Sequence, residues 1–142
     1  MIKIIGGKKY NTDTAEAVGQ YDNGLGYGDF KRLMETLYRK RTGEFFLYGQ
    51  GGPMTQYAEP VGNMRADGEK IIPLTFEEAQ KWAEEHMDAE EYEAVFGEVS
   101  EDSSTIGVMY SLPVASVNKV KKIATERRVT ASRVIADLID TL

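Results

Sequence analysis

Residues 105–113, TIGVMYSLP, alternate apolar residues with small or polar ones and stop at a proline. Alternation with a period of two is typical of a β-strand that buries one face. The predicted inner face consists of Ile106, Val108, Tyr110 and Leu112. The predicted outer face consists of Thr105, Gly107, Met109 and Ser111. No second strand pattern follows before the chain ends at Leu142, so this strand requires a partner from elsewhere.

Two amphipathic helices are predicted after the proline. Residues 114–128 carry an apolar side made of Val117, Val120, Ile123 and Ala124. Residues 130–142 repeat the pattern with Val134, Ile135, Leu138 and Ile139. Thr130 has the side chain and the position of an N-cap for the second helix. The predicted order is therefore strand, helix, tight turn and helix.

A unit of this size is too small to bury an adequate core alone. Two copies solve this problem, because they can pair their strands antiparallel and interleave their four helices. We therefore expect a homodimer. Its predicted core consists of Val108, Tyr110, Leu112, Val120, Ile123, Val134 and Leu138.

Residues 105–142 resemble the ribbon-helix-helix family of DNA-binding proteins, of the Arc and MetJ type. The resemblance rests on the strand that ends in Leu-Pro, on the apolar i, i+3, i+6 spacing of the first helix, and on Thr130-x-Ser132 at the start of the second. In that family the outer residues of the paired strands enter the major groove, which implies base contacts by Gly107, Met109 and Ser111. The start of the second helix binds a phosphate, which implies contacts by Thr130, Ala131, Ser132 and Arg133. Arg127 and Arg128 add positive charge to this predicted phosphate site. Arg128 stands in the turn where the family often has glycine, which predicts some backbone strain there.

Charge is unevenly distributed along the chain. Residues 1–103 carry 11 Lys and Arg against 20 Asp and Glu, whereas residues 104–142 carry 6 against 3. The net charge of −6 therefore hides a basic C-terminal part, which suits nucleic-acid phosphates. The first C-terminal helix carries three lysines, Lys119, Lys121 and Lys122. They are interpreted either as phosphate contacts or as the solvated face of that helix.

A polar and acidic stretch over residues 97–104 marks a boundary between two domains. We predict an acidic domain over residues 1–99, a linker over 100–104 and a ribbon-helix-helix module over 105–142. The fold class expected for the first domain is α+β, with a small antiparallel sheet and a helix pair.

Two hairpins are predicted in the first domain. One turns at Gly6-Gly7, and the other turns at Thr42-Gly43 with Arg41 facing Glu44 and Tyr38 facing Leu47. Residues 11–30 are expected to form a short helix or strand and then a loop. The glycines and prolines of residues 49–69 predict a largely irregular segment.

A helix pair is predicted over residues 75–97. Thr75 and Glu78 form a capping-box pattern, and Phe76, Ala79, Ala83 and Met87 form an apolar stripe. Asp88 and Glu91 mark a second helix start, with an apolar face of Tyr92, Val95 and Phe96 and an end at Gly97.

An acidic run lies within these two predicted helices and consists of Glu84, Glu85, Asp88, Glu90, Glu91 and Glu93. It is interpreted either as a solvated helix surface or as a surface that mimics nucleic acid and binds a basic groove on a partner. The run includes His86, the one histidine of the chain, which we expect to be at the surface or partly packed.

No enzymatic activity is expected, because no nucleophile lies near His86 and the sequence indicates no pocket for a pair of catalytic carboxylates. The chain has no cysteine, which excludes thiol catalysis and thiolate zinc sites, and we predict no metal and no cofactor. No apolar run is long enough to span a membrane, and no signal-peptide pattern opens the chain, so a cytoplasmic location is expected.

Residues 3–85 are similar to a small domain that recurs in plasmid, transposon and phage proteins of Gram-positive bacteria. The similarity is carried by three stretches, KKYNTDTAEAVGQYDNG, ETLYRKRTGEFFLYGQGGPMTQYA and IIPLTFEEAQKWAEE. Some proteins of that setting resemble anti-CRISPR inhibitors, which often join an inhibitory domain to a DNA-binding one.

Together these features predict a dimeric DNA-binding regulator of a mobile genetic element, in which the acidic domain engages another macromolecule. One alternative is an anti-CRISPR-type inhibitor of a host Cas nuclease complex that acts through the N-terminal domain. A further alternative is an antitoxin, in which one part neutralises a toxin and the other represses transcription.

Overall fold

A computed structural model describes residues 1–101 and 106–142 and divides the chain into two compact units, Met1–Gly107 and Val108–Leu142. We describe each unit by itself. Thr105, the first residue of the predicted C-terminal strand, lies outside the described residues, as do most residues of the predicted linker.

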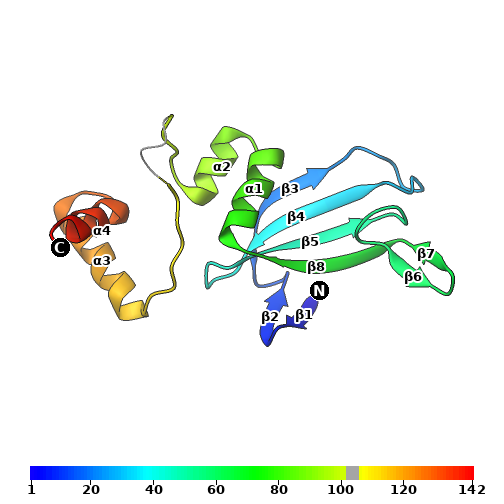
Figure 1. The fold of residues 1–142 in the computed structure, drawn as a ribbon, viewed down its shortest axis with the longest axis horizontal. Helices are drawn as coiled ribbons and strands as arrows, with labels where there is room; N and C mark the ends of the chain where they lie inside the picture. Colours follow the sequence, from blue (N-terminus) through cyan, green and yellow to red (C-terminus); the bar gives the residue numbers. More distant parts are fainter. Residues whose placement is uncertain (102–105) are drawn as a thin grey trace. The chain divides into compact units, whose positions relative to one another are not determined.

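The first unit is built on a four-stranded antiparallel sheet, as the α+β prediction requires (Figure 1). The spatial order of the strands is β3, β4, β5 and β8. Their bounds are Glu16–Asp22, Leu33–Arg39, Phe45–Gly51 and Gly68–Leu74. All neighbouring pairs in this sheet are antiparallel, which hairpins and short connections allow.

Two helices, α1 (Phe76–His86) and α2 (Ala89–Phe96), cover one face of this sheet (Figure 1). The capping box predicted at Thr75 and Glu78 is confirmed, because each side chain accepts a hydrogen bond from the other residue's backbone N–H. The buried centre of this layer consists of Leu37, Phe45, Leu47, Ala79, Trp82 and Ala83. The predicted stripe of α1 is therefore correct but omitted Trp82.

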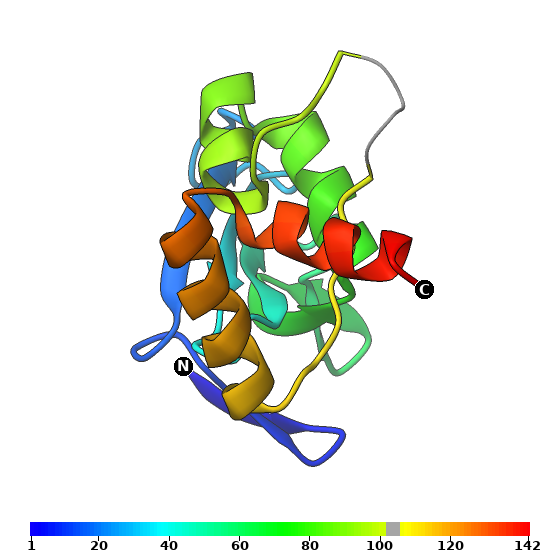
Figure 2. The same ribbon diagram turned by 90° about the vertical axis from the view of Figure 1, so that its left-hand side faces the viewer.

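The hairpin of β1 (Ile2–Ile5) and β2 (Lys8–Asn11) supplies a second, smaller core on the opposite face of the sheet (Figure 2). Its turn is at Gly6 and Gly7, as predicted, and both residues have the positive φ that this tight turn needs. Tyr10 packs edge-on against Phe46 of β5, with ring centroids 5.4 Å apart. Both faces of the central strands are thereby buried at this end of the sheet.

The hairpin of β4 and β5 has a different register from the predicted one. Tyr38 pairs with Phe46 and Leu37 with Leu47, so the expected pairing of Tyr38 with Leu47 is wrong by one residue. The turn contains three residues rather than two: Lys40 donates its N–H to the carbonyl of Glu44 at 2.8 Å, and Gly43 has a φ of 91°. A type I turn followed by a glycine bulge explains this geometry.

Two other segments are more regular than the sequence pattern predicted. Residues 16–22 form strand β3, which settles the choice between helix and strand. Within the segment predicted to be irregular, β5 extends to Gly51, and a small hairpin is formed by β6 (Glu59–Val61) and β7 (Met64–Ala66). Short strands that contain proline and glycine are hard to distinguish from loops by pattern alone.

The second unit is a pair of helices, α3 (Val114–Arg127) and α4 (Ala131–Asp140). Arg128 ends α3 in the left-handed conformation, with φ 56° and ψ 42°, so the strained turn predicted there is confirmed. Thr130 caps α4 as predicted, since its hydroxyl oxygen accepts the N–H of Arg133 at 3.1 Å. Residues 106–113 form neither helix nor strand in the single chain.

Candidate functional sites

The turn between α3 and α4 collects the predicted phosphate-contacting residues. Arg127, Arg128 and the first turn of α4, Ala131, Ser132 and Arg133, are all exposed. The first N–H groups of a helix have no acceptor inside the helix and carry a partial positive charge, so they can bind an anion. The side chain of Arg133 pairs with Asp137 at 3.3 Å, but an exposed i,i+4 pair of this kind is weak.

The predicted base-contacting residues lie on the segment before α3. Met109 and Ser111 are exposed, and Gly107 is exposed as the last residue of the first unit. In the described residues of the single chain this segment has no strand to pair with. Its role in reading bases therefore stays a prediction.

The predicted dimer core is largely uncovered in the single chain. Val134 is buried, and Val120 and Ile123 are half-buried. The other four residues are exposed, namely Val108 (58%), Tyr110 (77%), Leu112 (50%) and Leu138 (65%). Ile135 and Ile139 on α4 are exposed as well. The second unit therefore exposes large apolar side chains both on the segment before α3 and on α4.

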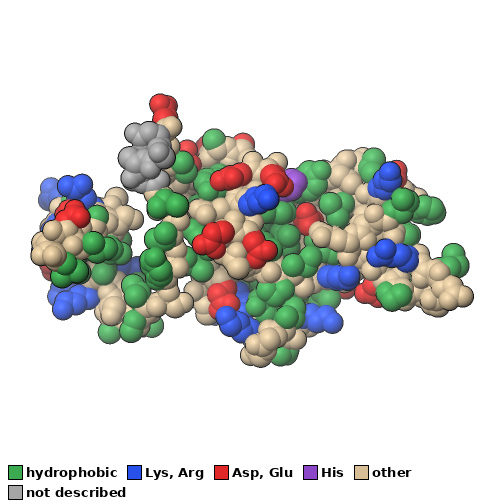
Figure 3. Space-filling view, viewed as in Figure 1, with side chains coloured by type: hydrophobic (Ala, Val, Ile, Leu, Met, Phe, Trp, Pro, Cys, Tyr) green, Lys and Arg blue, Asp and Glu red, His purple; other side chains and the backbone are tan. Residues whose placement is uncertain are grey.

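The acidic run predicted as a partner surface is spread over the end of α1 and over α2, where acidic side chains gather in Figure 3. Its members are Glu84, Glu85, Asp88, Glu90, Glu91 and Glu93, of which Glu93 is the one that is half-buried. Asp88 has a structural role, because its carboxylate accepts the N–H of Glu91 at 2.8 Å and caps α2. That backbone hydrogen bond is the main reason why the pKa of Asp88 is lowered.

His86 is partly packed, which agrees with one of the two expectations for it. Its ring stacks on Tyr21 with centroids 4.0 Å apart and lies near the ring of Trp82. No nucleophile stands in hydrogen-bond contact with it in the described part of the chain, so it has the contacts of a packing residue.

A buried carboxylate that the sequence analysis missed lies between the sheet and α1. Glu35 of β4 is only 6% exposed and accepts three hydrogen bonds. Its donors are the Tyr57 hydroxyl at 2.5 Å, the Trp82 indole at 3.2 Å and the Gln56 amide at 3.2 Å. Burial, and then the bond to Glu35, raise the pKa of Tyr57, so its hydroxyl stays protonated as a donor. The Glu35 cluster joins β4, α1 and the loop before β6.

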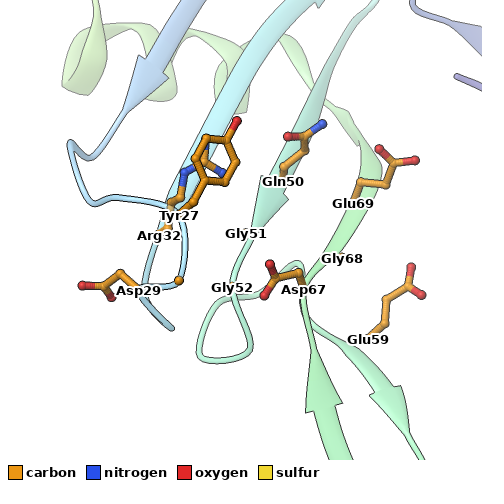
Figure 4. Close-up of a pocket in the computed structure, with 11 residues that line it drawn as sticks. Tyr27, Asp29, Arg32, Gln50, Gly51, Gly52, Glu59, Asp67, Gly68 and Glu69 are labelled. Atoms are coloured by element: carbon orange, nitrogen blue, oxygen red, sulfur yellow. The ribbon is translucent and has the colours of Figure 1, made fainter.

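A pocket of about 410 Å³ lies at the end of the sheet where β5 ends and β8 begins (Figure 4). The sequence did not predict it. On one side Arg32 lies 3.9 Å from the ring centre of Tyr27, a cation–π contact. Carboxylates on the other side come from Glu59, Asp67 and Glu69. The only signal for it in the sequence is the group of glycines at the strand ends, and these glycines also fit the irregular segment predicted there. No three His, Asp or Glu side chains in the described residues are arranged to hold a metal ion.

Comparison of the chain with protein-family models, with curated proteins and with solved structures finds no match. None of the helices within residues 1–101 and 106–142 has the length and apolar character needed to cross a membrane. Proposals about function therefore rest on the geometry of the two units.

Proposed function

We propose that this protein is a DNA-binding regulator of a mobile genetic element that dimerises through residues 105–142. The single observation that carries the proposal is the uncovered apolar face of the second unit. In that unit only Ala124 and Val134 are buried among the described residues, whereas large side chains such as Tyr110 and Leu138 face solvent. Exposed apolar surface of this kind is typical of an interface.

A second copy is the partner that the proposal assigns to this face. Residues 106–112 of two chains pair as antiparallel strands, which satisfies the backbone groups that one copy leaves unpaired. Pairing places Ile106, Val108, Tyr110 and Leu112 against the helices of both chains. The outer residues Met109 and Ser111 then face the major groove, where a hydroxyl can bond a base edge and a thioether can contact a thymine methyl group.

DNA is favoured as the ligand by the charge and capping of the helix pair. Residues 104–142 have a surplus of three positive charges, and two arginines stand next to the N-terminus of α4. In the proposed complex the first turn of α4 binds a phosphate oxygen through its free N–H groups, and Arg127 and Arg128 contact neighbouring phosphates.

A gel-shift titration with the DNA upstream of the protein's own coding sequence tests this proposal at about 50 and 200 mM salt. We expect a shift that prefers this DNA to a scrambled duplex and that weakens steeply at the higher salt. Replacing Arg127 and Arg128 by alanine should weaken binding. It should also reduce the slope of log K against log salt concentration by about one to two. A matched control replaces the exposed Lys31 and Arg65 of the first unit. No shift, or no preference for the upstream DNA, would remove the regulator proposal.

A second candidate function is inhibition of a host Cas nuclease complex through the first unit. The observation that favours it is the acidic surface of α1 and α2, because an anionic surface can compete with nucleic acid for a basic groove. Nuclease assays with the full chain and with a chain that ends before residue 105 test it. Inhibition that survives the truncation supports this function, and the absence of inhibition by the full chain contradicts it.

A further inference from the structure

The acidic surface of the first unit contains a pocket with an apolar floor. The pocket has a volume of about 360 Å³ and lies where α1 ends and α2 begins. It is lined by Glu84, Met87, Asp88, Ala89, Tyr92, Glu93 and Val99. We call it the α1–α2 pocket. All of these residues belong to the first unit.

The lining of this pocket combines apolar side chains with carboxylates. Met87 and Tyr92 pack with one side against the core beneath the helices, and Val99 is 58% exposed. Carboxylates come from Glu84 on α1 and from Asp88 and Glu93 around α2. Glu84 and Tyr92 line the same pocket. Burial, and then the charge of Glu84, raise the pKa of Tyr92.

Two of the three carboxylates are fixed by hydrogen bonds to the backbone. Asp88 caps α2 through the N–H of Glu91, and Glu93 accepts the N–H of Val99 at 3.2 Å. Side chains that are already ordered lose little conformational entropy when they bind a ligand. A purely solvated helix surface has no need of an apolar floor between ordered carboxylates.

We propose that the α1–α2 pocket binds an arginine side chain of a basic protein partner. The methylene groups of the arginine cover Met87 and Val99, its guanidinium plane lies against the ring of Tyr92, and its N–H groups bond Glu84 and Glu93. An arginine suits this lining better than a lysine, because its planar group stacks on aromatic rings and bonds carboxylates in pairs.

Charge complementarity selects a basic protein segment as the occupant. Residues 1–103 carry nine more acidic than basic side chains, so nucleic acid is repelled from this surface. The inference deepens the proposal that the acidic unit engages another macromolecule, and it rests on that proposal. It does not depend on DNA binding by the second unit.

The test titrates the full chain with a capped nonapeptide that contains three arginines spaced by glycine and alanine, and follows the backbone amide signals by NMR. A matched peptide carries citrulline, which keeps the shape of arginine without its charge. We expect saturable shifts centred on Met87, Tyr92 and Val99, and at least about tenfold weaker binding of the citrulline peptide, since charge-assisted hydrogen bonds are lost. Equal binding of both peptides would overturn the proposal.

Two double variants distinguish binding in the pocket from attraction of the peptide by the overall negative charge of the first unit. E84Q with E93Q removes two charges from the pocket but keeps the acceptor for the N–H of Val99. E59Q with D67N removes two charges from the other end of the sheet. We expect about tenfold weaker peptide binding for the first and less than about twofold change for the second, because exposed charges at a distance are screened. Equal losses in both variants would show a non-specific field and contradict the pocket.

The basic segment around Arg127 and Arg128 of the same chain is the competing occupant of the pocket. If R127A with R128A shifts the signals of Tyr92 and Val99 without any peptide, the pocket is filled by this segment and the proposal of an external partner is wrong. Unchanged signals support it. The gel-shift result stands apart from these outcomes, because loss of DNA binding leaves the peptide titration unaffected.

Discussion

The indole N–H of Trp82 donates a hydrogen bond to the buried carboxylate of Glu35 across 3.2 Å. Trp82 comes from α1 and Glu35 from β4, so this bond joins the helix layer to the sheet. Tyr57 and Gln56 bring the loop before β6 to the same carboxylate. A buried charge is tolerated only when its acceptor positions are filled, which explains why three donors from distant segments meet here.

Glu35→Ala should lower the free energy of unfolding by about 3 kcal/mol, because it leaves the donors of Trp82 and Tyr57 buried without an acceptor. Glu35→Gln keeps an acceptor oxygen and should cost about 1 kcal/mol. Urea unfolding followed by Trp82 fluorescence measures both. The exposed Glu59→Ala serves as the control, and a cost for Glu35→Ala no larger than the control's would show that the cluster contributes nothing.

Gly49→Ala should also destabilise the first unit. A Cβ atom at Gly49 would stand 1.9 Å from the ring of Tyr57, so the ring would have to leave its place beside Glu35. Overpacking of this kind typically costs about 1 to 3 kcal/mol. Gly26→Ala is the matched control, since a Cβ there meets no atom within 4 Å and its φ is not positive. Thermal unfolding of the two variants should differ by several degrees, and equal midpoints would contradict the close approach of Tyr57.

Acid should weaken the contact between the β1–β2 hairpin and the β4–β5 hairpin, which Lys8 and Glu44 make. Burial raises the pKa of Glu44, but the hydrogen bond from Lys8 and the charges of Lys40 and Lys8 outweigh it and hold the pKa below the ordinary value of 4.5. The stabilising contribution of this carboxylate is therefore present above pH 4.5 and is lost as the pH falls through its lowered pKa.

Glu44→Gln should accordingly cost less than about 1 kcal/mol at pH 7, as expected for ion pairs that are still partly open to solvent. The difference from the unmodified protein should be smaller at pH 3 than at pH 7, and it should shrink in about 1 M salt. Urea unfolding at both pH values measures how this difference in the free energy of unfolding changes with pH. A difference that grows as the pH falls would contradict the assigned ion pairs.

Arg128→Gly should raise stability and lower DNA affinity at the same time. Arg128 has a left-handed backbone, which costs an ordinary residue about 1 kcal/mol and glycine almost nothing. Arg127→Gly provides the contrast, because Arg127 is still helical and glycine there should cost about 1 kcal/mol. Thermal unfolding measures the effect on stability, and the gel shift measures the effect on DNA affinity. Lower stability for Arg128→Gly would show that contacts of the Arg128 side chain outweigh the cost of its left-handed backbone.

Local signals in the sequence predicted the four helices and two of the hairpins, but not every strand and not every register. Gly6 and Gly7 both have positive φ, and this fixes a two-residue turn without ambiguity. In the turn between β4 and β5, Gly43 is the one glycine with a positive φ. One such glycine is compatible with a two-residue or a three-residue connection. The register of β4 and β5 depends on that choice, which explains the error of one residue.

The Glu35 cluster was beyond prediction for a different reason. Its donors at positions 56, 57 and 82 are far from residue 35 in sequence, and no periodic pattern links them. A glutamate two residues before Leu37, on the same strand face, is the one local sign of a buried carboxylate. The capped helices, by contrast, follow from short-range patterns at Thr75, Asp88 and Thr130, and these were found.

The mass of the protein in solution tests the central proposal most directly. One chain has a mass of 15.9 kDa, and the proposal expects twice this value by light scattering. Val108→Asp should return the mass to that of one chain without unfolding it, because Val108 is exposed in the single copy and a charge is costly only inside the paired strands. A full-length protein that measures 15.9 kDa at the concentrations that shift DNA would contradict the dimer, and with it the assignment of residues 105–142.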